Sequence, residues 1–260
     1  MDALLTYDSV EISFGGAAVV RDMSFSLHPG EILGLVGESG SGKSTIIKAA
    51  MGLLGNSGLV TRGDIWFEGK NLPDLPEKEM RRIRGGKIGM IFQDAGASLC
   101  PIRTIGEQIF ESMTAHRQIT KTEAKDASLS LFAKLRFKDG ERIWNSYPFE
   151  LSGGMNQRAG IAISVLMNPS VLFADEPTSA LDVAVQRQVV DELLELRELF
   201  GTAIILVTHD IGVVSAMADS VLVLQQGNKM EYGRARDVLD HPQNSYTRKL
   251  LSAVPKLRRA

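Results

Sequence analysis

A glycine-rich stretch limits what this chain can fold into more than any other feature of its sequence. It fits the pattern G-x-x-x-x-G-K-[ST], follows a short apolar run at 31–36, and opens a helical stretch at about 43–52. The glycines let successive backbone N–H groups point at one anion, and the helix start adds a favourable dipole. The stretch consists of Gly37, Glu38, Ser39, Gly40, Ser41, Gly42, Lys43, Ser44 and Thr45. A strand, a phosphate-binding loop and a helix are therefore predicted in that order.

The side chains at the end of this loop indicate which phosphate it binds. Lys43 offers a positive charge to the β and γ phosphates of a nucleotide, and the Ser44 hydroxyl is a ligand for Mg²⁺. A chance glycine-rich loop is the alternative, but the flanking strand and helix argue against it. The sequence therefore predicts a site for a magnesium nucleotide.

Such a loop requires a second, acidic element, which a later apolar run supplies. Residues 171–174 are apolar and are followed by Asp175 and Glu176. We expect Asp175 to orient the Mg²⁺ shell, and Glu176 to accept a proton from, or polarise, the water that attacks the γ-phosphate. The alternative is that Glu176 is only a solvated carboxylate at a strand end.

The segments around these motifs predict an α/β fold. Apolar and polar residues alternate through 5–27 around Gly15-Gly16, which is typical of two antiparallel strands joined by a turn. Apolar runs at 171–174, 203–207 and 221–224 alternate with a helical pattern at 183–200, as in parallel βα units. A parallel sheet between helices is the expected core.

A helical segment interrupts this core. Residues 106–136 are rich in Glu, Lys, Gln and Ala and have no strong β segment, so we expect a mainly helical insertion that extends to about residue 166. No internal repeat or long linker is evident. We therefore expect one composite domain, with the core and β lobe at about 1–93 and 167–260 and the insertion at about 94–166.

Composition excludes several classes of protein. The net charge of -2 gives no general reason to bind nucleic acid. The single cysteine, Cys100, forms no internal disulfide, and the N-terminus has no secretion signal, so a cytoplasmic location is expected. No run reaches the ~18 apolar residues of a membrane span. Any membrane association is expected to be peripheral, at the cytoplasmic face of the inner membrane, through a partner.

A group of five residues, which precedes the acidic strand in the sequence, completes an ordered set of motifs. They are Leu151, Ser152, Gly153, Gly154 and Met155, followed by Asn156, Gln157 and Arg158. The set also contains Gln93 in an apolar run, Asp182 in Ser179-Ala180-Leu181-Asp182, and His209. Over nearly its whole length the chain resembles ABC ATPases, which implies the ABC ATPase fold: a RecA-like P-loop NTPase core with an N-terminal antiparallel β lobe and an inserted α-helical lobe.

The resemblance implies roles for these residues. In ABC ATPases the signature motif, here 151–155, faces the nucleotide of the opposite subunit, so two subunits sandwich ATP. It also implies that His209 holds the γ-phosphate, that Gln93 binds the metal and links it to the membrane subunit, and that Asp182 links the two sites. The alternatives are a structural histidine and a glutamine bonded to backbone.

An aromatic residue that stacks on the base is also implied. We assign it to Phe14, because the family places an aromatic residue near the end of the first strand region. Tyr7 is the weaker candidate. Either ring could instead be core packing.

Two further segments resemble the peptide and nickel importers. They are residues 94–101 after Gln93 and residues 241–255 near the C-terminus, and Met155 fits the same subgroup. Many peptide-importer ATPases continue into a cysteine-containing extension, which is not expected here, so no iron–sulfur cluster is expected. Peptides, nickel and a metal chelate all remain possible cargo. Cys100 is expected to be a packing residue, and Lys256, Arg258 and Arg259 a solvated tail.

The subgroup resemblance also implies partners. These are a second ABC ATPase subunit, preferably a different chain, two transmembrane permease subunits, and an extracytoplasmic substrate-binding protein. An exporter ATPase, or a non-transport ABC ATPase of translation or DNA repair, is the alternative.

Overall fold

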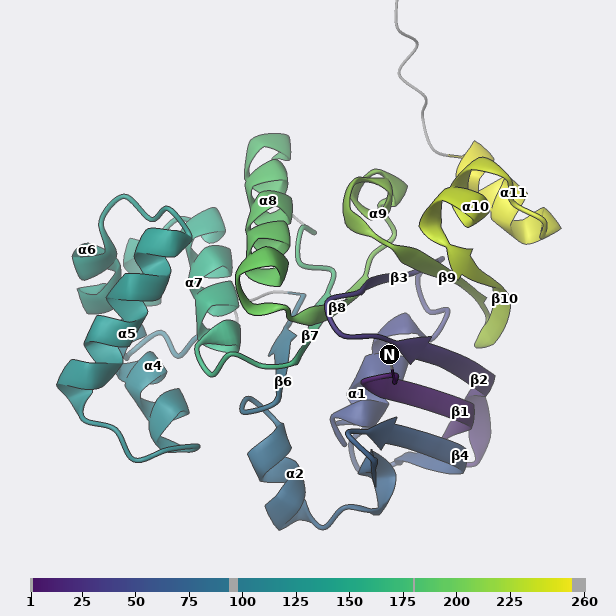
Figure 1. Ribbon diagram of the computed structural model, residues 1–260, viewed down its shortest axis with the longest axis horizontal. Coiled ribbons are helices and arrows are strands. Elements are labelled where there is room, and N and C mark those ends of the chain that lie inside the picture. Colours follow the sequence, from purple (N-terminus) through teal and green to yellow (C-terminus); the bar gives the residue numbers. More distant parts are fainter. Residues whose placement is uncertain (1, 94–97, 180, 254–260) are drawn as a thin grey trace, which may run out of the picture. The chain divides into compact units, whose positions relative to one another are not determined.

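The computed structural model describes residues 2–93, 98–179 and 181–253 (Figure 1). The chain forms two compact units: Met1–Met80 with Ala203–Ala260 is unit 1, and Arg81–Thr202 is unit 2. Helix α2 (Glu77–Ile83) crosses from one unit into the other. The domain boundaries expected from the sequence stay a prediction.

Unit 1 contains an antiparallel sheet of strand order β2-β1-β4-β5. Its strands are β1 (Leu5–Phe14), β2 (Ala17–Leu27), β4 (Gly58–Phe67) and β5 (Lys70–Asn71), followed by the short helix η1 (Leu72–Asp74). Gly15 and Gly16 have φ of 54° and 84°, the left-handed region that a tight turn requires. The predicted pair of antiparallel strands at 5–27 is confirmed.

A second sheet in unit 1 carries the phosphate-binding loop. Strands β9 (Ser220–Gln225), β3 (Ile32–Gly37) and β8 (Ala203–Val207) are parallel and almost wholly buried, which is why they read as continuous apolar runs. Strand β10 (Asn228–Arg234) pairs antiparallel at the edge of β9 and was not predicted. The helices are α1 (Lys43–Ala50), α9 (Ile211–Met217), α10 (Ala235–Asp240) and α11 (Ser245–Ser252).

Unit 2 is mainly helical, as expected for its central part. Helices α4 (Ile105–Thr114), α5 (Lys121–Lys134), α6 (Gly140–Asn145) and α7 (Gly153–Val165) lie together in Figure 1. The short helix η2 (Pro148–Glu150) precedes α7 in the sequence. Thr104 and Thr120 each form a capping box that fixes where α4 and α5 begin. The parallel pair β6 (Ile88–Ile91) and β7 (Val171–Asp175) and the helix α8 (Val183–Phe200) complete the unit.

None of the helices in the described part of the chain is long and apolar enough to cross a lipid bilayer. The longest, α8, has charged residues on its exposed face and buries Val189, Leu193 and Leu196. These three apolar residues therefore belong to the core of unit 2.

Candidate functional site

The phosphate-binding loop runs from the end of β3 to the start of α1 in unit 1. Gly37, Gly40 and Gly42 have φ of 153°, 76° and 99°. Residues that carry a Cβ atom rarely adopt such positive φ values. Gly42 is the N-cap of α1, and no side chain caps this helix. The N–H groups of the first turn of α1 therefore face the loop, in the arrangement that binds anions. This turn also carries Ser44 and Thr45, which are half-buried.

The Lys43 side chain braces the loop from inside. Lys43 is only 5% exposed. Its Nζ donates hydrogen bonds to the carbonyl oxygens of Gly37 (2.9 Å) and Glu38 (2.8 Å) and to Ser41 Oγ (3.5 Å). The cation is thus held at the centre of the loop, where a phosphate would meet it.

Gly37 is fixed by its surroundings as well as by its backbone angle. A Cβ on Gly37 would lie 2.2 Å from the Leu224 carbonyl oxygen, whereas one on Gly40 would meet no atom within 4 Å. We expect Gly37→Ala to lower the free energy of unfolding by about 2–4 kcal/mol. Gly40→Ala, which adds only the backbone strain, should cost about 1–2 kcal/mol. Urea titration of both variants measures this, and equal losses would contradict it.

His209 follows β8 in the same unit. It is exposed, unlike a buried structural histidine. The next residue, Asp210, caps α9 by accepting hydrogen bonds from the N–H groups of Gly212 (2.8 Å) and Val213 (3.3 Å). This cap fixes the backbone immediately after His209.

The two aromatic candidates have different environments. Phe14 is half-buried at the end of β1, paired with Ala17 and with Gly58 of β4. Tyr7 is 1% exposed, stacks on Phe25 at 4.4 Å, and donates its hydroxyl hydrogen to the Ile46 carbonyl oxygen (2.9 Å). Tyr7 is therefore core packing, and Phe14 stays the predicted base-stacking residue.

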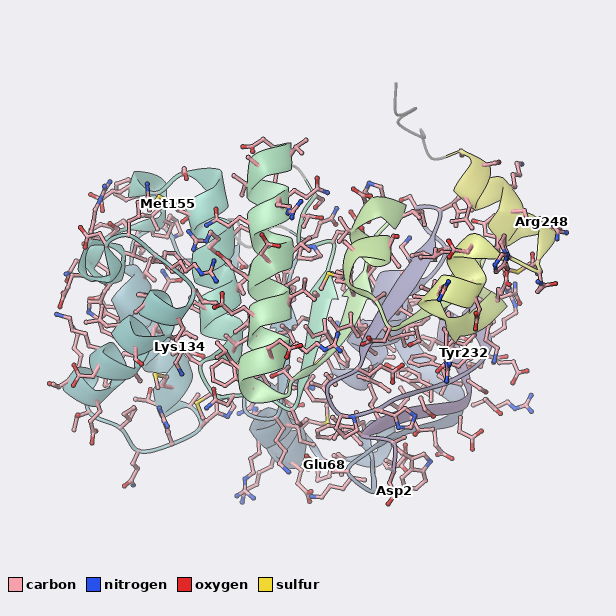
Figure 2. All side chains as sticks on the ribbon, turned by 45° about the horizontal axis from the view of Figure 1, so that its top comes forward. Asp2, Glu68, Lys134, Met155, Tyr232 and Arg248 are labelled. Atoms are coloured by element: carbon pink, nitrogen blue, oxygen red, sulfur yellow. The ribbon has the colours of Figure 1, made fainter. Side chains whose placement is uncertain are left out.

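A residue that the sequence reasoning missed lies against the loop. Tyr246 of α11 is 8% exposed. Burial raises the pKa of its hydroxyl, and the Glu38 carboxylate raises that pKa further, whereas the Glu38 backbone N–H lowers it. Helix α11, which also carries Arg248 (Figure 2), is tied to β10 because Glu231 accepts hydrogen bonds from the N–H groups of Gln243 (2.7 Å) and Asn244 (3.2 Å). The segment at 241–253 therefore belongs to the surroundings of the loop.

The acidic pair lies in unit 2 at the end of β7. Asp175 is 5% exposed, and Glu176 adopts the left-handed region with φ of 47°. Gln93 Nε2 donates to Glu176 Oε2 (3.2 Å), and Ser179 Oγ donates to the Glu176 carbonyl oxygen (2.9 Å). A non-glycine residue at positive φ is uncommon and often marks a functional position, so the strain fits the role expected for Glu176.

The signature residues form the start of α7, also in unit 2. Ser152 is the N-cap and accepts a hydrogen bond from Met155 N–H (3.3 Å); Met155 is labelled in Figure 2. A Cβ on Gly154 would lie 2.8 Å from Val185 of α8, whereas one on Gly153 would meet nothing within 4 Å. The fold of this chain therefore explains the glycine at 154, but it does not require one at 153.

Asp182 begins α8 in the same way. Its Oδ1 accepts hydrogen bonds from the N–H groups of Ala184 and Val185, both at 3.0 Å. The next residue, Val183, is 81% exposed. The two hydrogen bonds to Asp182 thus fix the backbone at the start of α8, and the apolar side chain of Val183 points to solvent.

The predicted site residues fall into two groups. Unit 1 holds Phe14, the loop and His209, and unit 2 holds Gln93, the signature, Asp175, Glu176 and Asp182. Residues 94–97, Ala180 and the tail at 254–260, with Lys256, Arg258 and Arg259, lie outside the described residues. The individual site roles stay predictions.

Comparisons with known proteins agree with this set of features. The family described as "ABC transporter" matches residues 20–179. The oligopeptide transport ATP-binding proteins of Salmonella typhimurium and Escherichia coli are 44% and 45% identical over 260 residues, 98% of this chain and 77% of each relative. The dipeptide transport ATP-binding protein of Lactococcus lactis is 43% identical over 93% of this chain and 69% of its own length.

Two solved structures are similar to the chain along most of its length. An ATP-binding cassette solved as a dimer in a post-hydrolysis state with ADP and Pi has a TM-score of 0.77 at 27% identity, covering 89% of this chain and 99% of its own. The CbiO1 protein of Clostridium perfringens, part of an ABC transporter complex, has a TM-score of 0.81 at 25% identity, covering 98% and 97%. The expected fold is confirmed.

Proposed function

Because this chain belongs to the ABC transporter family and is an ATPase of that family, we propose that it powers the import of peptides. The observation that carries the proposal is its 44–45% identity, over 98% of its length, to oligopeptide transport ATP-binding proteins. Nickel or a metal chelate is the second candidate cargo, on the resemblance of residues 94–101 and 241–255 to nickel importers as well.

The nucleotide is bound mainly by the loop at the start of α1. Its backbone N–H groups and Lys43 neutralise the phosphates, and Phe14 stacks on the base. Ser44, Gln93 and Asp175 offer a hydroxyl, an amide and a carboxylate oxygen, a donor set that fits Mg²⁺. Bound Mg²⁺ would neutralise charge that develops on the phosphates.

Glu176 is the proposed general base. A carboxylate accepts a proton from the attacking water as the water bonds to the γ-phosphorus, and the bond to the leaving ADP oxygen breaks. Gln93 orients this carboxylate through the 3.2 Å hydrogen bond to Oε2. His209 would donate to the γ-phosphate and hold it in line with the water.

Two ATPase subunits complete each other's sites. The open space around Gly153 supports this, because a glycine that its own fold does not require is explained by the close approach of something outside the chain. The start of α7, with Ser152 as its cap, is suited to the γ-phosphate of a nucleotide on a partner ATPase subunit. Asp182 would link the two sites, and the partner would be a second, different ATPase chain.

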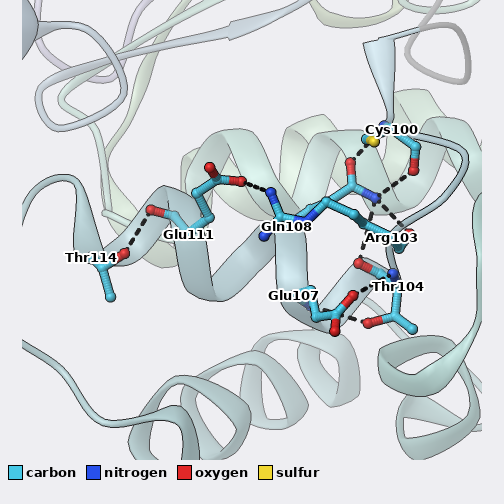
Figure 3. A network of polar contacts seen from close by, with 7 residues as sticks. All are labelled: Cys100, Arg103, Thr104, Glu107, Gln108, Glu111 and Thr114. Carbon is cyan, nitrogen blue, oxygen red and sulfur yellow. Dashed lines mark hydrogen bonds and ion pairs between the residues drawn. The ribbon is translucent and has the colours of Figure 1, made fainter.

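A groove in unit 2 is the proposed docking surface for the permease. It has a volume of about 410 Å³, and its lining includes Phe92, Leu99, Cys100, Gln108, Ser112 and Ser164. Phe92, next to Gln93, is 43% exposed. Gln108 fixes one wall: it donates to the carbonyl oxygens of Cys100 (3.1 Å) and Arg103 (3.0 Å) and accepts from Cys100 N–H (2.8 Å) (Figure 3). A helix of a transmembrane permease subunit would enter this groove and hold the chain at the cytoplasmic face of the membrane.

Filling the groove separates docking from catalysis. We expect Ser112→Arg, which places a long charged side chain in the groove, to abolish co-purification with the permease subunits. The pair of ATPase subunits without the permease should still hydrolyse ATP within about twofold of wild type. Thr114→Arg is the matched control, because Thr114 is exposed on the same helix but does not line the groove. Equal co-purification of both variants would refute this docking surface.

Uptake assays test the cargo. Cells that carry Glu176→Gln should lose uptake of labelled di- and oligopeptides supplied through the extracytoplasmic binding protein, while uptake of nickel, free or chelated, should not change. Loss of nickel uptake alone would replace peptides with nickel as cargo. Unchanged uptake of every cargo would leave export as the leading function.

A further inference from the structure

The signature helix α7 is fastened to the segment that follows Glu176. Gln157, buried on α7, donates through Nε2 to the Pro177 carbonyl oxygen (2.8 Å). Gly154 leaves no space between α7 and Val185, in the first turn of α8. The first contact joins α7 to the segment before α8, and the second sets the first turn of α7 against the first turn of α8.

One buried ion pair fixes the same two helices further along. Arg158 of α7 pairs with Glu192 of α8, and the two residues are only 8% and 4% exposed. The guanidinium also donates to the Leu135 carbonyl oxygen (2.5 Å) at the end of α5 and stacks over the Phe137 ring at 4.1 Å. One arginine therefore joins α7 to α8 and to the end of α5.

The Arg158–Glu192 pair is better suited to positioning the two helices than to stabilising the fold. Burial raises the pKa of the Glu192 carboxyl to about 7, while Arg158 opposes the rise; Glu195 and Asp191 on the same helix add to it. Glu192 Oε2 is buried and has no hydrogen-bond partner among the described residues. A pair that is costly to bury and incompletely satisfied contributes little net stability compared with apolar residues of similar size.

We propose that the Arg158–Glu192 pair is the joint that makes the signature residues and Asp182 move as one body, so that both reach the partner subunit together. The inference rests on the proposed function, in which Ser152 and Asp182 act on the partner's site. Arg158 and Glu192 are then positioning residues, because neither touches the nucleotide.

The test uses the assembled transporter and two readouts. Glu192→Gln should lower kcat for ATP about tenfold or more, because small displacements of the signature misplace its contacts with the γ-phosphate. It should also lower the Tm by about 5–10 °C, since it leaves the Arg158 charge buried without its partner. Affinity of the isolated chain for a fluorescent ATP analogue should stay within about twofold, because the phosphate-binding loop belongs to unit 1.

A double variant separates position from stability. Arg158→Met with Glu192→Leu replaces the pair by apolar side chains and should recover the Tm but not kcat. Glu198→Gln is the matched control, because Glu198 is an exposed glutamate on the same helix and is not among the charges that shift the Glu192 carboxyl. It should change neither readout.

The outcomes are distinct. Recovery of kcat together with the Tm in the double variant would show that the pair only packs, and unchanged kcat in Glu192→Gln would also overturn the proposal. If Glu176→Gln leaves the uptake of every cargo unchanged, the proposed function itself fails, and this inference fails with it.

Discussion

Replacing Glu176 with Gln is expected to lower ATP turnover by about 10²–10⁴-fold, because general-base catalysis contributes about that much and an amide does not accept the proton. The substitution is nearly isosteric, so ATP binding should stay within about threefold. Gln93 Nε2, which donates to Glu176 Oε2 at 3.2 Å, can also donate to the new amide oxygen. Release of inorganic phosphate and the affinity for a fluorescent ATP analogue measure the two effects.

Glu198→Gln is the control for this variant, because Glu198 is an exposed glutamate on α8. It should leave turnover unchanged. A Glu176→Gln protein that hydrolyses ATP at more than about a tenth of the wild-type rate would show that another group activates the water.

Replacing Lys43 with Ala is expected to lower kcat/KM by about 10²–10³-fold. The loss has two sources: one cation that stabilises the phosphate charge is gone, and the carbonyl oxygens of Gly37 and Glu38 lose a charged donor at 2.9 and 2.8 Å. Affinity for ATP should fall about 10- to 100-fold, as expected for a lost charge-assisted hydrogen bond. Equilibrium binding and steady-state hydrolysis measure both quantities.

Lys48→Ala is the matched control on the same helix, since Lys48 lies in the last turn of α1, away from the loop. Its binding and turnover should match those of wild type. An Lys43→Ala protein that binds ATP as tightly as wild type would mean that the backbone N–H groups alone hold the phosphates.

The sequence predicted those helices and strands whose ends and buried positions are determined by nearby residues. Helix α8 matches the predicted 183–200, because Asp182 caps its start and Gly201, with φ of 65°, ends it. Strand β10 was missed because it is a largely exposed edge strand without an apolar run. Strand β4 was missed because Gly63 interrupts it: its φ is 75°, and a Cβ there would lie 2.3 Å from the Asp8 carbonyl oxygen, beside an irregular register with β1.

The candidate site divides in a similar way. Motif residues such as Lys43 and Glu176 could be named from the sequence because their spacing and flanks are local. The pairing of Arg158 with Glu192, 34 residues apart, and the approach of Tyr246 to Glu38 depend on how helices pack, and no local pattern specifies them. Packing between distant segments is what sequence periodicity does not encode.

Cys100 gives the groove a practical property. The sequence contains one cysteine, and it is half-buried in the wall of the groove that we assign to the permease. A thiol-reactive fluorophore would therefore label the unaltered protein at a single known place. The alkylation rate of Cys100 can be compared between the isolated chain and the assembled transporter. The comparison would report, without any engineered residue, how often the ATPase subunit leaves the permease during turnover.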